Sequence, residues 1–331
     1  MVMKAIVARP AQAKAVLALE EVADPTLSAH QLLIEVHASA VNRADLLQRR
    51  GLYPPPKGES EILGLECAGV VQKIGREVTR FRPGDRVMAL LGSGGYAESV
   101  AIHENLALPV PASLSLIEAA AVPEAFLTAY EALLRTAELA PGERVLIQAG
   151  ASGVGSAAIQ VAREVGAYVF ATTKGQPKLS KLRELGVHRV IDYEHEDFAE
   201  IIRSEGREGA DVILDLIGGS YAERHQAVLA AGGRWVVIGL LGGAKATLDL
   251  TRVIQQRQRL LGVVMRSRSL PDKSAIVSGF LRELWPWLAD GRLAPLIDSV
   301  VPLAEAERAH ERMAQNQNIG KIVLQVRASA E

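Results

Sequence analysis

A glycine-rich segment near the middle of the chain carries the clearest chemical signal. The apolar run Val145 to Ala149 leads into Gly150-Ala151-Ser152-Gly153-Val154-Gly155, and small and apolar residues follow at helical spacing as far as Gly166. A strand, a glycine turn and a helix in this order are typical of the first unit of a dinucleotide-binding fold, because the N–H groups at the helix N-terminus bind a pyrophosphate. An ordinary tight turn between a strand and a helix is the alternative.

The residue types within the turn fit that chemistry. We expect Gly150 to allow the tight turn and Gly155 to let the helix pack closely on the strand. Ser152 stands where the usual fingerprint has its second glycine. Its hydroxyl is left to donate to a phosphate oxygen.

The end of the next apolar run favours one of the two nicotinamide dinucleotides. NAD-binding folds carry an acidic residue about 20 positions after the glycine turn, where it binds the adenosine ribose. Here that position falls on Thr173 or Lys174. Lys174 and Lys178 lie where a 2′-phosphate would sit, so we expect NADP(H). Lys178 is alternatively a solvated lysine in the first turn of a helix.

Further strand ends place residues on the same rim of the expected sheet. Tyr193 follows the third apolar run. We expect it to pack on the adenosine half of the cofactor or to bond its phosphate, and the alternative is a half-buried surface tyrosine. Glycines follow the fourth and fifth runs, at Gly218-Gly219 and at Gly239-Leu240-Leu241-Gly242-Gly243. They indicate either backbone close to a ligand or ordinary turns.

The pattern around the turn predicts the elements that hold these residues. Apolar runs alternate with amphipathic helical stretches such as 178–185 and 198–204, which predicts a doubly wound parallel sheet. The runs are 145–149, 168–172, 189–191, 212–216, 235–240 and 260–264.

The two ends of the chain have a different pattern of apolar and turn-forming residues. Up to about residue 120, short apolar or alternating runs and Pro- and Gly-rich turns predict a compact, largely β domain. The runs are 4–7, 31–40, 66–74 and 86–90. After helices over 274–289 and 304–313, a strand at 321–326 is expected to return to this first domain.

Composition narrows the class of protein. The 331 residues suffice for two domains, and a net charge of −1 gives no indication of nucleic acid or an anionic membrane as a partner. No apolar stretch is long enough to cross a bilayer, and the N-terminus lacks the layout of a signal peptide. Cys67 is the single cysteine, which excludes an intrachain disulfide and a cysteine-rich zinc lobe. A soluble cytoplasmic protein is expected.

Over essentially its full length the sequence resembles the zinc-free quinone oxidoreductases of the medium-chain dehydrogenase/reductase superfamily. Within them it is most similar to the tumour-suppressor-inducible type of NADPH:quinone oxidoreductase. The resemblance rests on residues 40–51 with Tyr53-Pro54-Pro55-Pro56, on 64–71, on Leu127-Thr128-Ala129-Tyr130, on the glycine turn and on 318–323. It implies a GroES-like catalytic domain over 1–123, completed by 268–331, and a Rossmann NADP(H)-binding domain over 124–267.

The same resemblance implies roles for single residues. It places Asn42, Tyr53 and Thr128 around nicotinamide and substrate in a cleft between the domains. Asn42 would orient a substrate oxygen through its amide, and Thr128 would offer a hydroxyl. Tyr53 would gate or stack on a flat substrate, or else only anchor its loop. Asp45 is expected to shape the segment. The backbone at Gly239, Leu240 and Leu241 and at Val264, Met265 and Arg266 would flank the nicotinamide. Asn318 would reach the cofactor from the C-terminal segment.

Relatives that bind catalytic zinc carry a cysteine where this chain has Asn42 and a histidine where it has Leu65. Asparagine and leucine cannot form a nitrogen–sulfur site, so no metal is expected. The quinone hypothesis follows from chemistry: a quinone spreads the accepted charge over a conjugated ring and needs no Lewis acid. We therefore expect metal-free hydride transfer from NADPH to quinones, with ortho-quinones foremost and the proton coming from solvent.

Two alternative functions stay open. One is an NADPH-dependent enoyl or alkenal reductase, and the other is a non-catalytic NADPH-binding sensor or structural protein. The resemblance also implies a homodimer, with a tetramer as the alternative. Relatives pair two nucleotide-binding sheets edge to edge, and the run 260–264 is apolar enough to be buried near such an edge.

Overall fold

The chain forms two compact units. The computed structural model describes residues 2–9, 15–206 and 209–327. One unit comprises Met1–Leu127 and Met265–Glu331, and the other comprises Thr128–Val264. The first is rich in β-structure and the second is built on a parallel sheet, so the expected α/β fold is confirmed. None of the helices within the described ranges is long and apolar enough to span a membrane.

A seven-stranded sheet dominates the first unit. Six strands follow the order β14-β15-β3-β4-β5-β7, and β6 also pairs with β3. A separate hairpin is formed by β1 (Val2–Arg9) and β2 (Val16–Ala23). The sheet strands are β3 (Gln31–Val41), β4 (Glu66–Ile74), β5 (Arg86–Leu90), β6 (Ser99–His103), β7 (Ala107–Pro109), β14 (Ile297–Pro302) and β15 (Lys321–Gln325).

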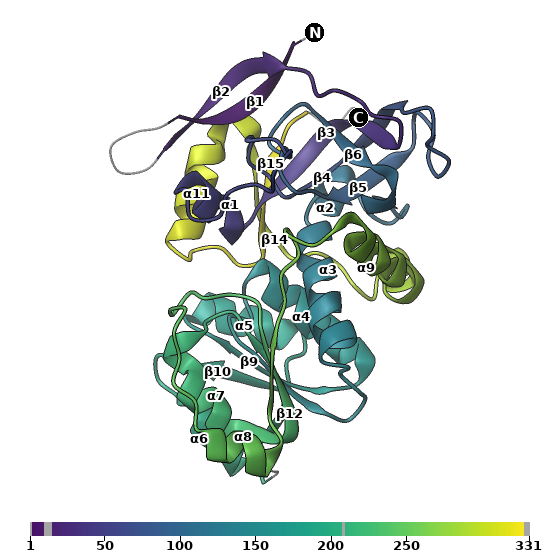
Figure 1. Cartoon of the computed structure of the whole chain (residues 1–331). Coiled ribbons are helices and arrows are strands. Elements are labelled where there is room, and N and C mark those ends of the chain that lie inside the picture. The colour runs from purple at the N-terminus through teal and green to yellow at the C-terminus, as the bar shows by residue number, and fades with distance from the viewer. Residues whose placement is uncertain (1, 10–14, 207–208, 328–331) are drawn as a thin grey trace. The chain divides into compact units, whose positions relative to one another are not determined.

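The C-terminal strand completes this sheet, as predicted. β15 pairs antiparallel with β3, with Ile322 opposite Val41 and Leu324 opposite Ser39, and Figure 1 shows the two strands together. Alternate residues of a strand point to opposite faces of a sheet, so one face of β3 and β4 supplies the core. Leu32, Ile34 and Val36 pack there with Cys67, which is fully buried.

Helices of the first unit cover the sheet and carry several site residues. They are α1 (Arg43–Arg49), η1 (Glu104–Leu106), α2 (Leu116–Ala119), α9 (Leu270–Glu283), α10 (Trp285–Ala289), η4 (Leu303–Glu305) and α11 (Ala306–Ala314). The single helix predicted over 274–289 is in fact α9 followed by α10. The break falls at Leu284, because Pro286 in the first turn of α10 has no N–H to continue the hydrogen bonds of α9.

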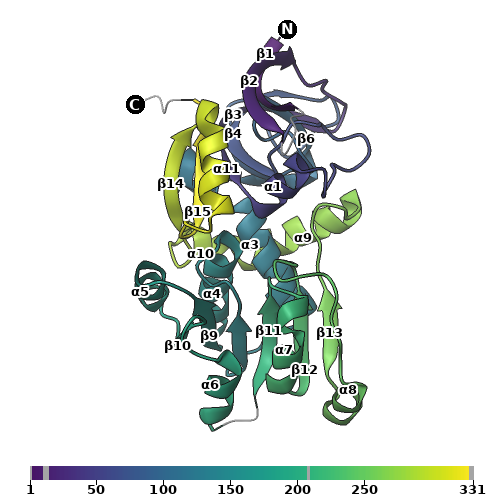
Figure 2. The ribbon, with the colours of Figure 1, turned by 90° about the vertical axis from the view of Figure 1, so that its left-hand side faces the viewer.

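The second unit contains six parallel strands in the order β10-β9-β8-β11-β12-β13. This is the order of a doubly wound nucleotide-binding sheet. The strands are β8 (Arg144–Ile147), β9 (Tyr168–Thr173), β10 (Arg189–Asp192), β11 (Ala210–Asp215), β12 (Leu229–Val237) and β13 (Arg259–Gly262). Figure 2 shows β11, β12 and β13 side by side.

Helices pack on both faces of this sheet. Phe170 and Trp235 contact α6 and α7 on one face. Ala171, next to Phe170 in β9, points to the other face, where α4 and α5 lie. From Thr128 onward, the helices of this unit are the end of α3 (Pro123–Tyr130), its continuation as the π-helical turn η2 (Glu131–Thr136), then α4 (Gly153–Val165), α5 (Gln176–Glu184), α6 (Phe198–Ser204), η3 (Gly219–Tyr221), α7 (Ala222–Val228) and α8 (Leu250–Gln256).

The last strand is an exposed edge. β13 pairs only with β12 among the described strands, and Leu260 is 53% exposed. Leu250 and Ile254 of α8 are also largely exposed. Within a single chain, Leu260 and Val264 of the run 260–264 are exposed, Leu261 is half-buried and Val263 is buried, and burial of this run between two copies stays a prediction.

Candidate functional site

The glycine turn joins β8 to α4 in the way a dinucleotide site requires. Ser152 caps α4, and its hydroxyl oxygen accepts a hydrogen bond from the N–H of Gly155 at 3.0 Å. The hydroxyl hydrogen remains for another acceptor. A Cβ on Gly155 would lie 2.4 Å from the carbonyl oxygen of Ala149, so only glycine lets the helix approach the strand end this closely. The α4 N-terminus is therefore open to an anion.

The reason expected for Gly150 is wrong. The residue of the turn with positive φ is Ala149, at 52°. A Cβ on Gly150 would instead lie 2.8 Å from Leu182 and 3.0 Å from the Cβ of Ala171. Gly150 is needed because neighbouring side chains pack tightly against the turn. The positive φ is adopted by the preceding residue, Ala149.

Replacing Gly155 with alanine should destabilise the second unit by about 1–3 kcal/mol, because the added methyl overlaps a backbone oxygen that cannot move away. Urea unfolding followed by circular dichroism measures this change. Gly262→Ala is the matched control, since a Cβ there meets nothing within 4 Å. Equal stability of the two variants would contradict the packing role of Gly155.

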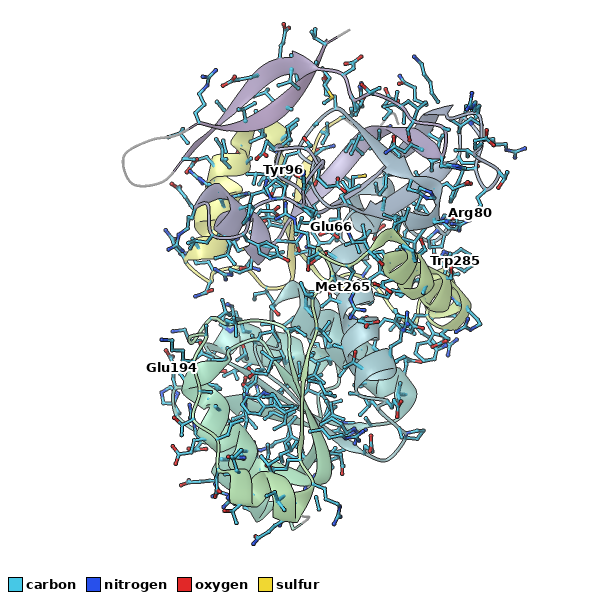
Figure 3. All side chains as sticks on the ribbon, in the orientation of Figure 1. Glu66, Arg80, Tyr96, Glu194, Met265 and Trp285 are labelled. Carbon is cyan, nitrogen blue, oxygen red and sulfur yellow. The ribbon has the colours of Figure 1, made fainter. Side chains whose placement is uncertain are left out.

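The end of β9 combines buried hydroxyls with an exposed lysine. The Thr172 hydroxyl donates to Gln148 Oε1 at 2.5 Å, and Thr173 is 4% exposed. Lys174 is exposed and forms an ion pair with Glu194 at 2.8 Å, which raises the pKa of the lysine through that hydrogen bond. Glu194 is labelled in Figure 3. The prediction from sequence did not include this acidic partner.

Two other predicted cofactor residues lie near this strand end. The Tyr193 ring centroid is 6.0 Å from the Lys174 ammonium, and the tyrosine is 41% exposed. Lys178 lies in the first turn of α5 and is partly exposed. Lys174 and the Tyr193 ring thus lie together at the carboxyl ends of β9 and β10, where a parallel sheet binds its ligand.

The loop after β12, whose backbone is predicted to contact the cofactor, packs against the end of β11. The N–H of Leu241 donates to the carbonyl oxygen of Leu216, and a Cβ on Gly239 would lie 2.8 Å from that oxygen. Leu240 and Leu241 both have more than half of their surface exposed. The second unit ends with Val264, 44% exposed.

A buried network supports these loops. Asp215 Oδ1 accepts from the N–H groups of Ile217 and Gly218, and its Oδ2 accepts from Trp235 Nε1 at 2.9 Å. His225 Nδ1 lies 3.3 Å from Oδ2, and both side chains are fully buried. Burial opposes ionisation of Asp215, but the adjacent His225 imidazole and the backbone hydrogen bonds from Gly218 and Ile217 outweigh it and lower the pKa of the carboxyl. The network holds the loop after β11 in place.

Thr128 of α3 has an unsatisfied hydroxyl. The residue is 7% exposed, and its Oγ1 has no hydrogen-bond partner among the described residues. A buried polar group without a partner is costly unless a ligand supplies one. Together with the cradle at Gly155, this orphaned atom in the second unit fits a bound dinucleotide. Thr128 remains a predicted contact.

In the first unit, the Asn42 side chain is fully engaged inside the protein. Its Oδ1 accepts from Lys321 Nζ at 2.6 Å, while its Nδ2 donates to Glu66 Oε1 at 2.8 Å and to the carbonyl oxygen of Ala40 at 3.3 Å. Both amide hydrogens are therefore used. The expectation that Asn42 offers its amide to a substrate oxygen does not fit this arrangement, because an internal carboxylate is the better acceptor.

The cation at the centre of that group is Lys321. Its Nζ lies 2.6 Å from Glu66 Oε1 and also donates to the carbonyl oxygen of Val41, and both charged side chains are almost fully buried. Glu66 is labelled in Figure 3, in the β-rich unit. We call Asn42, Glu66 and Lys321 the buried ion pair cluster.

Asp45 holds the segment together, as expected. It is fully buried and accepts from the N–H groups of Asn42 and Gly64 and from the Tyr96 hydroxyl. Burial raises the pKa of Asp45 to about 6, although these hydrogen bonds oppose the shift. Asp45 and Asn42 also form a capping box at the start of α1.

Tyr53 and Arg266 form a second polar group in the first unit. The guanidinium lies 5.0 Å from the Tyr53 ring centroid and donates to the carbonyl oxygens of Tyr53 and Gly92 and to Gln48 Oε1. Arg266 thus fixes the proline-rich loop. Its neighbour Met265 is 5% exposed and is labelled in Figure 3.

Asn318 shapes its own turn. Its side chain is 8% exposed and donates from Nδ2 to the carbonyl oxygen of Gly320 at 2.7 Å. Gly320 has a φ of 84°, and a Cβ there would lie 2.2 Å from the carbonyl oxygen of Leu296. The amide oxygen of Asn318 has no bond among those described, so a cofactor contact by this residue stays a prediction.

Sequence reasoning missed two titratable residues. Burial and the charge of Glu66 raise the pKa of Glu124 to about 8. Lys273 of α9 is 7% exposed, and burial lowers the pKa of its amine. The sequence offered only an acidic residue after Pro123 and a lysine in an amphipathic helix, and such charges are ordinarily solvated.

The residues at the positions of a zinc site do not fit a metal. Asn42 Oδ1 already binds an ammonium, and Leu65 is a buried hydrocarbon. Across the described part of the chain, no group of three or more His, Cys, Asp or Glu residues is arranged to hold a metal ion. A divalent cation beside Lys321 would also be repelled by its charge.

Comparison with known proteins gives two family matches. Residues 28–112 match the alcohol dehydrogenase GroES-like domain, and residues 185–324 match a family described as zinc-binding dehydrogenase. The quinone oxidoreductase of Rattus norvegicus is 30% identical over 307 residues, which cover 92% of each chain.

Other relatives differ in length and activity. A phenolphthiocerol/phthiocerol polyketide synthase of Mycobacterium tuberculosis is 34% identical over 298 residues, which are 89% of this chain but only 14% of the synthase chain. The CurK enoyl reductase structure has a TM-score of 0.82 at 32% identity, covering 93% of this chain and 95% of CurK. An NAD-dependent alcohol dehydrogenase structure has a TM-score of 0.86 at 31% identity, covering 98% of this chain and 100% of the dehydrogenase chain.

Proposed function

Because the chain belongs to the medium-chain dehydrogenase/reductase superfamily, we propose that it is an NADPH-dependent reductase that transfers hydride to quinones without a metal ion. The buried ion pair cluster carries this proposal. Reduction of an isolated carbonyl builds charge on one oxygen, which a Lewis acid normally stabilises, but Asn42 binds Lys321 where zinc-dependent relatives place a metal ligand. A quinone delocalises that charge over its ring, and ortho-quinones are the acceptors we favour.

The bound dinucleotide would supply the hydride. Backbone N–H groups from Gly150 to Gly155 would hold its pyrophosphate, and Lys174 and Lys178 its 2′-phosphate. The Thr128 hydroxyl would receive the hydrogen-bond partner that it lacks. The role of this chain is to orient the cofactor and acceptor and to exclude water.

Changing Lys178 to glutamate should weaken NADPH binding far more than NADH binding. Loss of a charged phosphate contact and the added repulsion are together worth about 1–3 kcal/mol. Fluorescence titration of both cofactors measures the difference. Arg183→Glu makes the same change of charge at an exposed position of the same helix. If Lys178→Glu weakens both cofactors equally, the lysine does not bind the 2′-phosphate.

A second candidate is reduction of a carbon–carbon double bond, which the similarity to an enoyl reductase favours. The test is NADPH oxidation by chelator-treated protein against ortho-quinones, para-quinones and enals, with NADH alongside. Turnover of quinones with a preference for NADPH would support the main proposal, and turnover of enals alone would support the second. Tight NADPH binding without turnover would leave a sensor or structural role.

We further propose that two copies pair through the exposed β13 edge, with Leu260 at the interface. An unpaired edge with apolar side chains is suited to strand addition. Analytical ultracentrifugation should give a dimer that Leu260→Asp dissociates. A monomeric wild-type protein would rule the pairing out, and a tetramer would require a further interface.

A further inference from the structure

Glu124 and Lys273 are two titratable residues of the first unit whose side chains have no direct partner among the described residues. Among the described residues, the Glu124 carboxyl forms no hydrogen bond or ion pair, although its backbone N–H donates to Glu66 Oε2 at 2.8 Å. The Lys273 ammonium likewise has no hydrogen bond or ion pair within the described ranges, yet the residue is 7% exposed. Burial lowers the pKa of Lys273, while the charges of Glu59 and then of Glu124 oppose that shift, so both acidic residues lie near the ammonium within the first unit.

Several elements contribute charges around Glu124. The acidic groups are Glu66 of β4 and Asp45 of α1, and both oppose ionisation of its carboxyl. The basic groups are Lys321 of β15, Lys273 of α9, and Arg266 in the segment before α9. Burial and Glu66 prevail over these cations, so Glu124 is protonated at neutral pH.

The group also adjoins the expected acceptor surface. Burial, followed by the charge of Glu124, raises the pKa of the Tyr53 phenol, and the Arg266 guanidinium lies over the same ring. The residue Glu124 is partly exposed, while burial desolvates its carboxyl. A protonated acid beside an aromatic surface is what a reductase needs at the atom that receives the proton.

We propose that Glu124 is the proton donor of the reductase and that Lys273 is a positioning residue that stabilises the carboxylate left behind. This inference rests on the proposed function. Hydride addition turns the acceptor into an anion. The O–H bond of Glu124 then breaks as its proton bonds to the acceptor oxygen, or to carbon in an enal, and solvent reprotonates the carboxylate. The sum is NADPH, H⁺ and acceptor giving NADP⁺ and reduced acceptor.

The principal test compares Glu124→Gln with Glu61→Gln, the same substitution at an exposed position of the same unit. We expect kcat to fall by about 100-fold or more in Glu124→Gln, with the affinity for NADPH unchanged. The wild-type kcat should decline as pH rises above about 8, and this decline should be absent in Glu124→Gln. Glu124→Asp, which keeps an acid, should recover part of kcat.

Lys273→Met tests the positioning role. Removing a cation should raise the pKa of Glu124 further and move the alkaline decline to higher pH, whereas a merely structural lysine would lower kcat without moving it. Infrared difference spectra at neutral pH should show a protonated carboxyl in the wild type that is missing in Glu124→Gln, a readout independent of turnover.

The outcomes separate the two proposals. An active wild type with an equally active Glu124→Gln and an unchanged pH profile overturns the proton donor but leaves the reductase standing. A wild type that turns over neither quinones nor enals overturns both. If circular dichroism shows that Glu124→Gln is unfolded, two other readouts replace it. They are the partial recovery of kcat in Glu124→Asp and the infrared band of a protonated carboxyl in the wild type. Absence of both overturns the inference.

Discussion

Replacing Lys321 with methionine is expected to lower the free energy of unfolding by about 3–5 kcal/mol, the largest stability loss we foresee. Glu66 is fully buried, and its only ion-pair partner among the described residues is Lys321. The substitution leaves that carboxylate uncompensated and also removes a hydrogen bond to Asn42 Oδ1. Urea unfolding monitored by circular dichroism measures the loss.

The double variant Lys321→Met/Glu66→Gln is the control. Asn42 Nδ2 and the Glu124 N–H donate to different oxygens of Glu66, so the single amide oxygen of glutamine keeps only one of the two bonds, but the buried charge is gone and part of the lost stability should return. If the double variant is as unstable as Lys321→Met alone, the loss comes from packing or from the bonds to Asn42 and Val41, and the buried charge is not its cause.

Replacing Asp215 with alanine should cost at least about 3 kcal/mol, because three N–H donors, two of them buried and one partly buried, lose their acceptor at once. Asp215→Asn should cost less, since one amide oxygen still accepts from Ile217 and Gly218. The loop after β11 should loosen as well, so cofactor affinity should fall in Asp215→Ala. Unfolding and fluorescence titration measure the two effects.

The cost at Asp215 should depend on pH. Its folded-state pKa lies below the ordinary value, so its stabilisation is present above about pH 4 and is lost as the pH falls through the lowered pKa. The difference in unfolding free energy between the wild type and Asp215→Ala should therefore shrink only below about pH 4. A difference that shrank between pH 6 and 8 would contradict an ionised, hydrogen-bonded Asp215.

The sequence was informative where burial on both sides left an unbroken apolar pattern. β8, β9 and β11 lie between two layers of helices, so they read as continuous apolar runs, and all were predicted. β2 was missed because none of its residues is fully buried and its sequence alternates without a strong apolar face. β14 was missed as well, because only Val301 of its six residues is buried.

Site residues were predictable where local chemistry decides. The fingerprint glycine Gly155 is required by a contact six residues away in sequence, at Ala149. Asn42 behaves differently, since its partner Lys321 is 279 positions along the chain. Glu124 is unusual because burial and the charge of Glu66, which lies on another element, raise the pKa of its carboxyl. No periodicity or spacing in one sequence reveals such pairings.

The lone thiol has a bearing on the chemistry of the acceptors. Quinones and enals are themselves alkylating agents, and thiolates are their preferred targets in proteins. Cys67 is the only cysteine of the chain, it is fully buried, and burial raises the pKa of its thiol far above neutrality. The folded protein thus offers no thiolate to an electrophile, and we expect that incubation with a quinone or an enal leaves Cys67 unmodified as long as the protein stays folded.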